Sequence, residues 1–234
     1  RAQDVFSMAG ELYGDWERAP APFDQYPVPE HPPLQSSTDT VVTQPVNVSM
    51  IMAGWHGPKA REDTKATFAA DVFSFILGQK TSQFQKNMVD SGIALQASLS
   101  YYTLQHTGPI TATIVSTPGN VLKAKQTFLK EVDKFTDPGY FTDQQLETAK
   151  TLLEVDAIYN QEKASEYVHT VSFWWGITGL DYYRDYFENL RAVTREDIVN
   201  YVETYIQDKP FVMAVLVNPE IQKKLQLAEG SLVR

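Results

Sequence analysis

Apolar and polar residues alternate from residue 39 to Trp55, and the stretch is rich in β-branched side chains. This pattern predicts one or two β-strands, interrupted at Pro45, because successive side chains of a strand point to opposite faces. Residues 94–106 and 110–116 alternate in the same way and are joined through Gly108-Pro109, which predicts a hairpin. The apolar run 211–219 predicts a closing strand.

Helical spacing governs most of the remaining sequence. Residues 60–79 begin with acidic residues, and their apolar side chains recur at the spacing of an amphipathic helix: Phe68, Val72, Phe75 and Ile76. Thr142 and Thr194 each precede a helical pattern with a polar side chain three residues on, as at a helix N-terminus. The sequence therefore predicts helices over 60–79, 82–90, 120–135, from 142, and over about 163–175, 180–190 and 195–206.

The order of these elements limits the fold class. Strands come first, then two helices, a strand pair, several helices and a final strand. This is neither a strict βαβ alternation nor an all-β meander. We therefore expect a two-layer α+β domain with a largely antiparallel sheet covered on one face by helices.

The N-terminal part of the chain has a different pattern. Residues 1–16 suit a short helix that ends near Gly14, and a dense run of prolines follows over 19–45. Proline fixes φ and lacks an N–H donor, so this run predicts a linker without regular structure. The expected organisation is a terminal helix of a preceding domain, a linker, the main domain and a tail, over residues 1–16, 17–38, 39–220 and 221–234.

Charge and composition exclude several classes of partner. The net charge is −9 and the basic residues are not clustered, so the chain lacks the attraction that nucleic acid or an anionic membrane surface requires. Membrane insertion is not expected, because no apolar run approaches the roughly 18 residues of a membrane span. The chain begins at Arg1 without a signal-peptide pattern, which suggests a mature protein or a piece of a longer one. The absence of cysteine excludes disulfides and a thiol nucleophile.

The sequence holds few candidates for a metal site. HEXXH and HXXEH are absent, so no zinc peptidase motif is encoded. Glu162, Glu166 and His169 would lie on one stripe of a helix and are the best local candidate. Glu-x-x-His sites of di-iron bundles need a second copy, which the sequence lacks. A solvated helix face is therefore the favoured interpretation, with a metal site as the alternative.

An aromatic cluster lies in the same region. It comprises Phe173, Trp174, Trp175, Tyr182, Tyr183, Tyr186 and Phe187. A ligand cage is one interpretation, but the helical spacing favours core or interdomain packing. The region of Trp174 and Trp175 is a candidate for an exposed apolar patch, and a homodimer of the isolated chain is then possible.

Six segments in this order carry a resemblance to a known family: GWHGP, FILGQ, SQFQKNMVDSGIAL, STPGNVLKA, FTDQQLETAK and LRAVTREDI. Over residues 46–218 the chain resembles the C-terminal, non-zinc-binding domain of the M16 zinc metallopeptidases, the family of pitrilysin, insulysin and the mitochondrial processing peptidase. Residues 1–16, with ELYGDW, resemble the last helix of a preceding domain of that family.

The resemblance implies a clamshell in which an N-terminal half binds zinc through HXXEH and the C-terminal half closes over the peptide. In active members, the segment that matches residues 86–96 carries an arginine and, seven residues later, a tyrosine, which hold the substrate. Here Val89 stands in place of the arginine, and Leu95 or Gln96 in place of the tyrosine. Neither valine nor leucine donates a hydrogen bond, so this segment is expected to be scaffold, with Leu95, Ala97 and Leu99 packing inward on a half-buried strand. Tyr101 and Tyr102 are the candidates for a compensating substrate contact.

Three functional hypotheses remain. The first is a non-catalytic half of an M16-type zinc endopeptidase: this chain provides no catalytic residue and no metal ligand, and zinc comes from a partner domain or subunit that carries HXXEH. The second is a structural module without proteolytic activity, like core subunits of respiratory complexes. The third is an independent metal enzyme built on Glu162, Glu166 and His169. The periplasm or cell envelope is the expected location, with mitochondrial matrix or cytoplasm as alternatives.

Overall fold

The computed structural model describes residues 1–233, and contacts within it divide the chain into a first unit, Arg1–His31, and a second that begins at Pro32. The first unit contains α1 (Ala2–Tyr13), which ends at Gly14 as predicted, and the one-turn helix α2 (Pro22–Gln25). The linker is therefore not wholly irregular. Proline is tolerated in the first turn of a helix, where its missing N–H would have no partner in any case.

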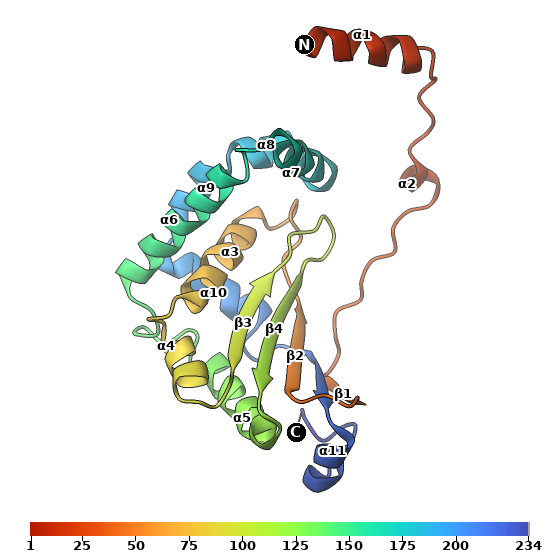
Figure 1. Ribbon diagram of the computed structural model, residues 1–234. Helices are drawn as coiled ribbons and strands as arrows, with labels where there is room; N and C mark the ends of the chain where they lie inside the picture. The colour runs from red at the N-terminus through yellow and green to blue at the C-terminus, as the bar shows by residue number, and fades with distance from the viewer. Residues whose placement is uncertain (234) are drawn as a thin grey trace. The chain divides into compact units, whose positions relative to one another are not determined.

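The second unit is built on one five-stranded sheet (Figure 1). Its strands are β1 (Thr38–Thr43), β2 (Ser49–His56), β3 (Gln96–Tyr101), β4 (Pro109–Ser116) and β5 (Val212–Val217). The order across the sheet is β1-β5-β2-β4-β3, and every neighbouring pair is antiparallel except β1 with β5. The break between β1 and β2, the β3–β4 hairpin and the closing strand are all confirmed.

The helical elements of the second unit are α3 (Thr64–Gly78), α4 (Gln83–Gln85), the π-helical turn η1 (Lys86–Asp90), the 3₁₀ turn η2 (Pro118–Asn120), α5 (Val121–Val132), α6 (Asp143–Tyr159), α7 (Ala164–Ile177), α8 (Leu180–Arg184), α9 (Tyr186–Ala192), α10 (Arg195–Tyr205) and α11 (Pro219–Leu225). Capping boxes at Thr142 and Thr194 open α6 and α10, as the sequence predicts. The single helix predicted over 180–190 is wrong, because the chain leaves helical geometry at Asp185 and forms two short helices.

Helices cover one face of the sheet, and Figure 1 shows α3, α6, α9 and α10 gathered on that side. The central helix is α3, of which Phe68, Val72 and Ile76 are almost completely buried, whereas Phe75 is half-buried. The same core contains the inward side chains of the strands, such as Trp55 of β2, which lies 6.3 Å from Phe128 of α5 between ring centroids. The α+β class predicted from the element order is confirmed.

The segment that leads into β3 is partly as expected. Ala97 and Leu99 point into the core, but Leu95 is 57% exposed, so its predicted inward packing is wrong. Leu95 precedes the first residue of β3 and therefore does not share the alternation of the strand. Its backbone N–H still donates to the carbonyl of Val115 at 2.7 Å.

The residues after 220 contact the rest of the second unit. Leu227 and Leu232 are buried, and the carboxylate of Asp39 in β1 accepts hydrogen bonds from the backbone N–H groups of Gly230, Leu232 and Val233 at 2.6, 2.7 and 3.0 Å. Lys125 of α5 donates to the carbonyl of Leu232 at 2.7 Å. No helix among the described residues is long and apolar enough to cross a membrane.

Candidate functional site

The end of the β3–β4 hairpin holds the two tyrosines singled out in the sequence, and their environments differ. Tyr101 is half-buried, and its hydroxyl donates a hydrogen bond to the carbonyl of Pro58 at 2.9 Å. Tyr102 is 56% exposed, and its ring lies 5.9 Å from that of Phe173 in α7. Tyr102 therefore presents its side chain at the surface, while Tyr101 fastens the hairpin to the loop that follows β2.

Two glycines make room for the Tyr101 ring. A Cβ atom on Gly108 would lie 2.4 Å from that ring, and a Cβ atom on Gly57 would lie 2.7 Å from the carbonyl oxygen of Gly108. Both separations are far shorter than a real carbon contact. The loop after β2 and the hairpin loop therefore approach each other closely only because neither position carries a side chain.

The segment that replaces the arginine and tyrosine pair lies on η1 and the start of β3. Val89 is half-buried and packs against the core, and Gln96 is exposed at the first residue of the edge strand. Met88 next to Val89 is fully buried. These contacts make η1 an anchored part of the scaffold and leave no cationic side chain at the position of Val89.

The candidate metal ligands do not form one helical stripe. Glu162 precedes α7, and only Glu166 and His169 lie on the helix, so the predicted spacing is wrong. All three residues are exposed. Among the described residues, no group of three or more His, Cys, Asp or Glu side chains is close enough to hold a metal ion.

The carboxyl group of Asp71, a residue of α3, lies near several tyrosines. Asp71 is the only acidic residue of α3 and is half-buried, and burial raises the pKa of its carboxyl group to about 7. Burial, together with the charge of Asp71, raises the pKa of the Tyr182 and Tyr186 hydroxyls, which therefore stay protonated. Tyr182 donates to the hydroxyl of Thr67 at 2.7 Å, because Thr67 gives its own proton to the carbonyl of Thr64.

Part of the aromatic cluster packs against α3 through Phe68. The ring of Tyr182 stacks on Phe68 and on Trp174, each at 4.9 Å between centroids. Trp175 points away and is 69% exposed. Trp174, Tyr182 and Tyr186 therefore join α7, α8 and α9 to α3 through Phe68, as the packing interpretation expects, whereas Trp175 is exposed.

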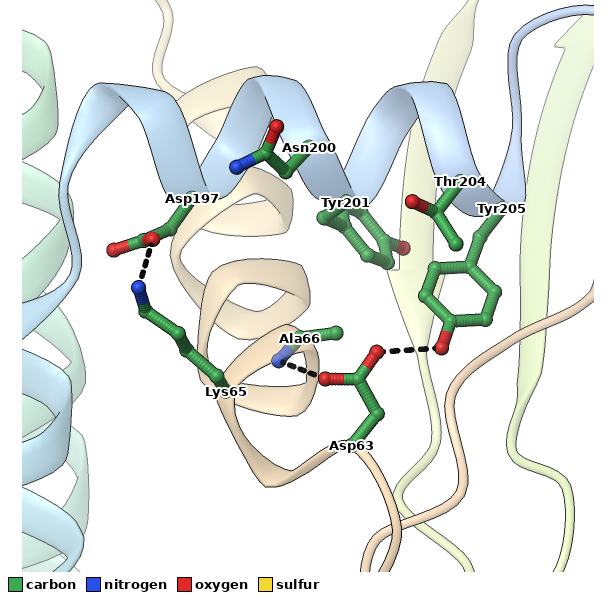
Figure 2. A pocket seen from close by; sticks show the side chains of 8 residues that line it. All are labelled: Asp63, Lys65, Ala66, Asp197, Asn200, Tyr201, Thr204 and Tyr205. Carbon is green, nitrogen blue, oxygen red and sulfur yellow. Dashed lines mark hydrogen bonds and ion pairs between the residues drawn. The ribbon is translucent and has the colours of Figure 1, made fainter.

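A small cavity of about 110 Å³ lies between the start of α3 and α10 (Figure 2). The two carboxylates at its rim are satisfied within the protein. Asp63 accepts from the hydroxyl of Tyr205 at 2.7 Å and from the backbone of Ala66, and Asp197 pairs with Lys65 at 2.6 Å (Figure 2). The arrangement therefore fastens α3 to α10, and its charged groups are not left for a ligand.

Within the described part of the second unit, the sheet face opposite the helices carries no helix (Figure 1). One row across this face consists, in order, of Val42, Leu216, Met50, Val115 and Gln96, which are paired in register from β1 to β3. Val42 in this row, Met52 in the next row and Val212 in the row after that are between 42% and 44% exposed. The open face therefore combines apolar side chains, most of them from β5 and β2, with threonines of β1 and β4 and polar side chains of β3.

A family model described as the peptidase M16 inactive domain matches residues 1–153, which is well over half of the chain. The chain belongs to this family. The resemblance drawn from the sequence motifs is thereby confirmed. No curated protein sequence matches the chain significantly.

Solved structures show the same fold as this M16 inactive-type domain. A protease from Helicobacter pylori superposes with a TM-score of 0.79 at 21% identity, over 92% of this chain and 52% of that one. The periplasmic protease PqqL from Escherichia coli superposes with a TM-score of 0.66 at 12% identity, over 93% of this chain and 24% of that one. A chain of complex III from Candida albicans superposes with a TM-score of 0.64 at 15% identity, over 82% of this chain and 47% of that one. The M16 domain thus spans about half the length of the Helicobacter protein.

Sequence reasoning missed Asp71. A lone acid between the buried apolar residues Ala70 and Val72 of α3 was the available signal, because a carboxylate is rarely placed among core residues without a reason. The tyrosines near Asp71 come from four elements, β3, α8, α9 and α10, and three of these follow Asp71 by more than a hundred residues. Their approach to α3 depends on tertiary packing, which local spacing does not encode.

Proposed function

We propose that this chain is the non-catalytic half, or a non-catalytic subunit, of an M16-type zinc endopeptidase. The observation that carries the proposal is the match to the M16 inactive domain, combined with the apolar and half-buried Val89 at the position of the family's substrate-binding arginine. In this role the chain provides a wall of the peptide chamber, while zinc and the general base come from a partner domain or subunit that carries HXXEH.

The open face of the sheet supports a role as a wall. Side chains such as Met50 and Leu216 on a sheet face without a helical cover leave an apolar surface, which commonly marks a binding surface for protein or peptide. The polar residues Ser98 and Ser100 of β3 continue this face to the edge of the sheet. A surface of this kind suits extended peptides of varied sequence. Tyr102 at the exposed hairpin end is the remaining candidate for a direct substrate contact.

The location that fits this role best is the periplasm. The similar protease PqqL from Escherichia coli is periplasmic, which agrees with the location that the family resemblance implies. A chain with net charge −9 would also carry little affinity for anionic membrane surfaces.

Reconstitution tests the proposal. The chain is purified alone and together with an HXXEH-containing M16 half from the same organism, and hydrolysis of an unstructured fluorogenic peptide is measured. We expect no hydrolysis by this chain alone, and a rate for the pair that exceeds the rate of the catalytic half alone. A catalytic half that is fully active without this chain, and does not bind it, would overturn the proposal.

A structural module without any proteolytic role is the second candidate, because the chain is also similar to a component of complex III from Candida albicans. The same experiment separates the two functions. A stable complex with a partner that lacks HXXEH, and no peptide hydrolysis by that complex, would favour the structural role.

A further inference from the structure

A second cavity, of about 360 Å³, lies between α6, α7, α8 and α9, outside the sheet face and the hairpin described above. Its size is at the lower end for small-ligand pockets, which commonly range from about 300 to 1,000 Å³. Its apolar lining comes from Ala157, Val171, Leu180 and Phe187. The cavity can therefore accept one apolar or aromatic side chain.

Three tyrosines complete this lining. They are Tyr167 of α7, Tyr183 of α8 and Tyr186 of α9. The rings of Tyr167 and Tyr183 lie 6.4 Å apart between centroids. The hydroxyl oxygen of Tyr183 is buried and has no hydrogen-bond partner among the described residues. Buried polar atoms are normally paired, so this hydroxyl is a candidate for contact with a bound molecule.

Arg184 is the only charged side chain that lines the cavity among the described residues, although the chain as a whole is strongly acidic. Its guanidinium lies 3.3 Å from the carboxylate of Asp181, and both side chains are well exposed. An exposed ion pair of this kind is screened by solvent and exchanges readily for another anion. A guanidinium group also binds a carboxylate with two parallel hydrogen bonds.

We propose that this cavity, the α6–α9 pocket, binds the C-terminal residue of a peptide. An apolar or aromatic side chain fills the pocket, and the terminal carboxylate binds Arg184 in place of Asp181, with the Tyr183 hydroxyl as a further donor. Asp156 and Asp185 adjoin the lining residues Ala157 and Arg184 in the chain, and their negative charges oppose a bound anion, so the affinity is modest. The inference does not rest on the proposed function, because it concerns peptide ends whether or not the chain takes part in proteolysis.

The test compares two peptides that differ only at the terminus: acetyl-Gly-Gly-Phe as the free acid and as the amide. Each is titrated into the full chain, and amide shifts are followed by ¹⁵N NMR. We expect shifts in α7 and α8, and binding of the acid about tenfold tighter than that of the amide. Acetyl-Gly-Gly-Ala as the free acid should bind more weakly than the phenylalanine peptide, because it leaves the pocket unfilled.

Substitutions test which residues cause the preference for the free acid over the amide. Arg184→Gln should abolish the preference for the acid, and Tyr183→Phe should reduce it while the ring still fills the pocket. Arg61→Gln removes an exposed arginine that does not line the pocket and should leave the preference unchanged. The spectra of the unbound variants report whether each is folded.

Three results would overturn the inference. The first is equal affinity for acid and amide. The second is an undiminished preference in Arg184→Gln. The third is binding of N-acetylphenylalanine as tight as that of the tripeptide acid, since this would assign the pocket to free acylated amino acids rather than to peptide ends.

Discussion

Asp39 offers a quantitative test of how the C-terminal residues are held. Its carboxylate is almost completely buried and accepts three backbone hydrogen bonds, from Gly230, Leu232 and Val233. Asp39→Ala removes all three, and Asp39→Asn converts one acceptor oxygen into a donor that faces a backbone N–H. Both variants should release the residues after α11 from β1.

The size of the effect has an upper limit. Hydrogen bonds to a charged group contribute about 1.5–3 kcal/mol each, so three would sum to roughly 5–9 kcal/mol if they were independent. Released residues regain conformational entropy, however, and their backbone groups are hydrated again. The loss of stability therefore cannot exceed the net free energy with which the segment docks. Burial of Leu227 and Leu232 contributes about 1.5–3 kcal/mol each before that entropy is subtracted. We expect a loss of about 3 kcal/mol for Asp39→Ala.

The assay is urea denaturation combined with hydrogen exchange. Asp39→Ala should lower the free energy of unfolding by the amount above and remove exchange protection at residues 230–233. Asp90 is exposed and serves as the control, with Asp90→Ala expected to change stability by no more than about 0.5 kcal/mol. Unchanged protection at 230–233 together with a loss below about 1 kcal/mol would refute the reasoning.

Three further predictions concern the site and the surface. Asp71 has a folded pKa of about 7, above its unfolded value, so its burial costs stability as pH rises from about 4 through 7. Asp71→Asn should therefore be more stable than the parent chain at pH 8, by about 2 kcal/mol or more, with little difference at pH 4. Urea denaturation at both pH values measures this difference in stability. A larger gain at pH 4 than at pH 8 would contradict the prediction. Gly108→Ala forces a Cβ against the Tyr101 ring and should cost about 1–3 kcal/mol in thermal or urea unfolding, whereas Gly119→Ala, where nothing lies within 4 Å, should be nearly neutral; equal effects would remove the steric argument. The exposed Trp175 should promote concentration-dependent dimerisation of the isolated chain, so light scattering should show weaker dimerisation of Trp175→Ser, and identical behaviour of the two proteins would exclude this residue from the contact.

The fold could be predicted to a large extent because its signals are local. Alternation of apolar residues locates the strands, and the side chains of Thr142 and Thr194 locate two helix starts through hydrogen bonds within four residues. The errors fall where local signals are absent. The break at Asp185 is a change of backbone geometry without a proline or glycine, and Leu95 lies one residue outside the alternation that it was assigned to.

The site was less accessible to sequence reasoning for a physical reason. Motif comparison identified Val89 as a departure from the family pattern, because that position is defined by its neighbours in the chain. The environment of Asp71, the exposure of Tyr102 and the α6–α9 pocket arise from contacts between segments that are far apart in the sequence. Tyr101 and Tyr102 are adjacent in sequence and receive opposite environments, since successive side chains at a strand end point to opposite sides.

The central claim is that this chain supplies a wall for peptide and no metal centre of its own. The most direct measurement is the zinc content of the purified chain after dialysis, with hydrolysis of an unstructured peptide measured on the same sample. The account predicts zinc no higher than in the dialysis buffer and no hydrolysis. Stoichiometric zinc that survives dialysis, accompanied by peptide hydrolysis that a chelator abolishes, would contradict it.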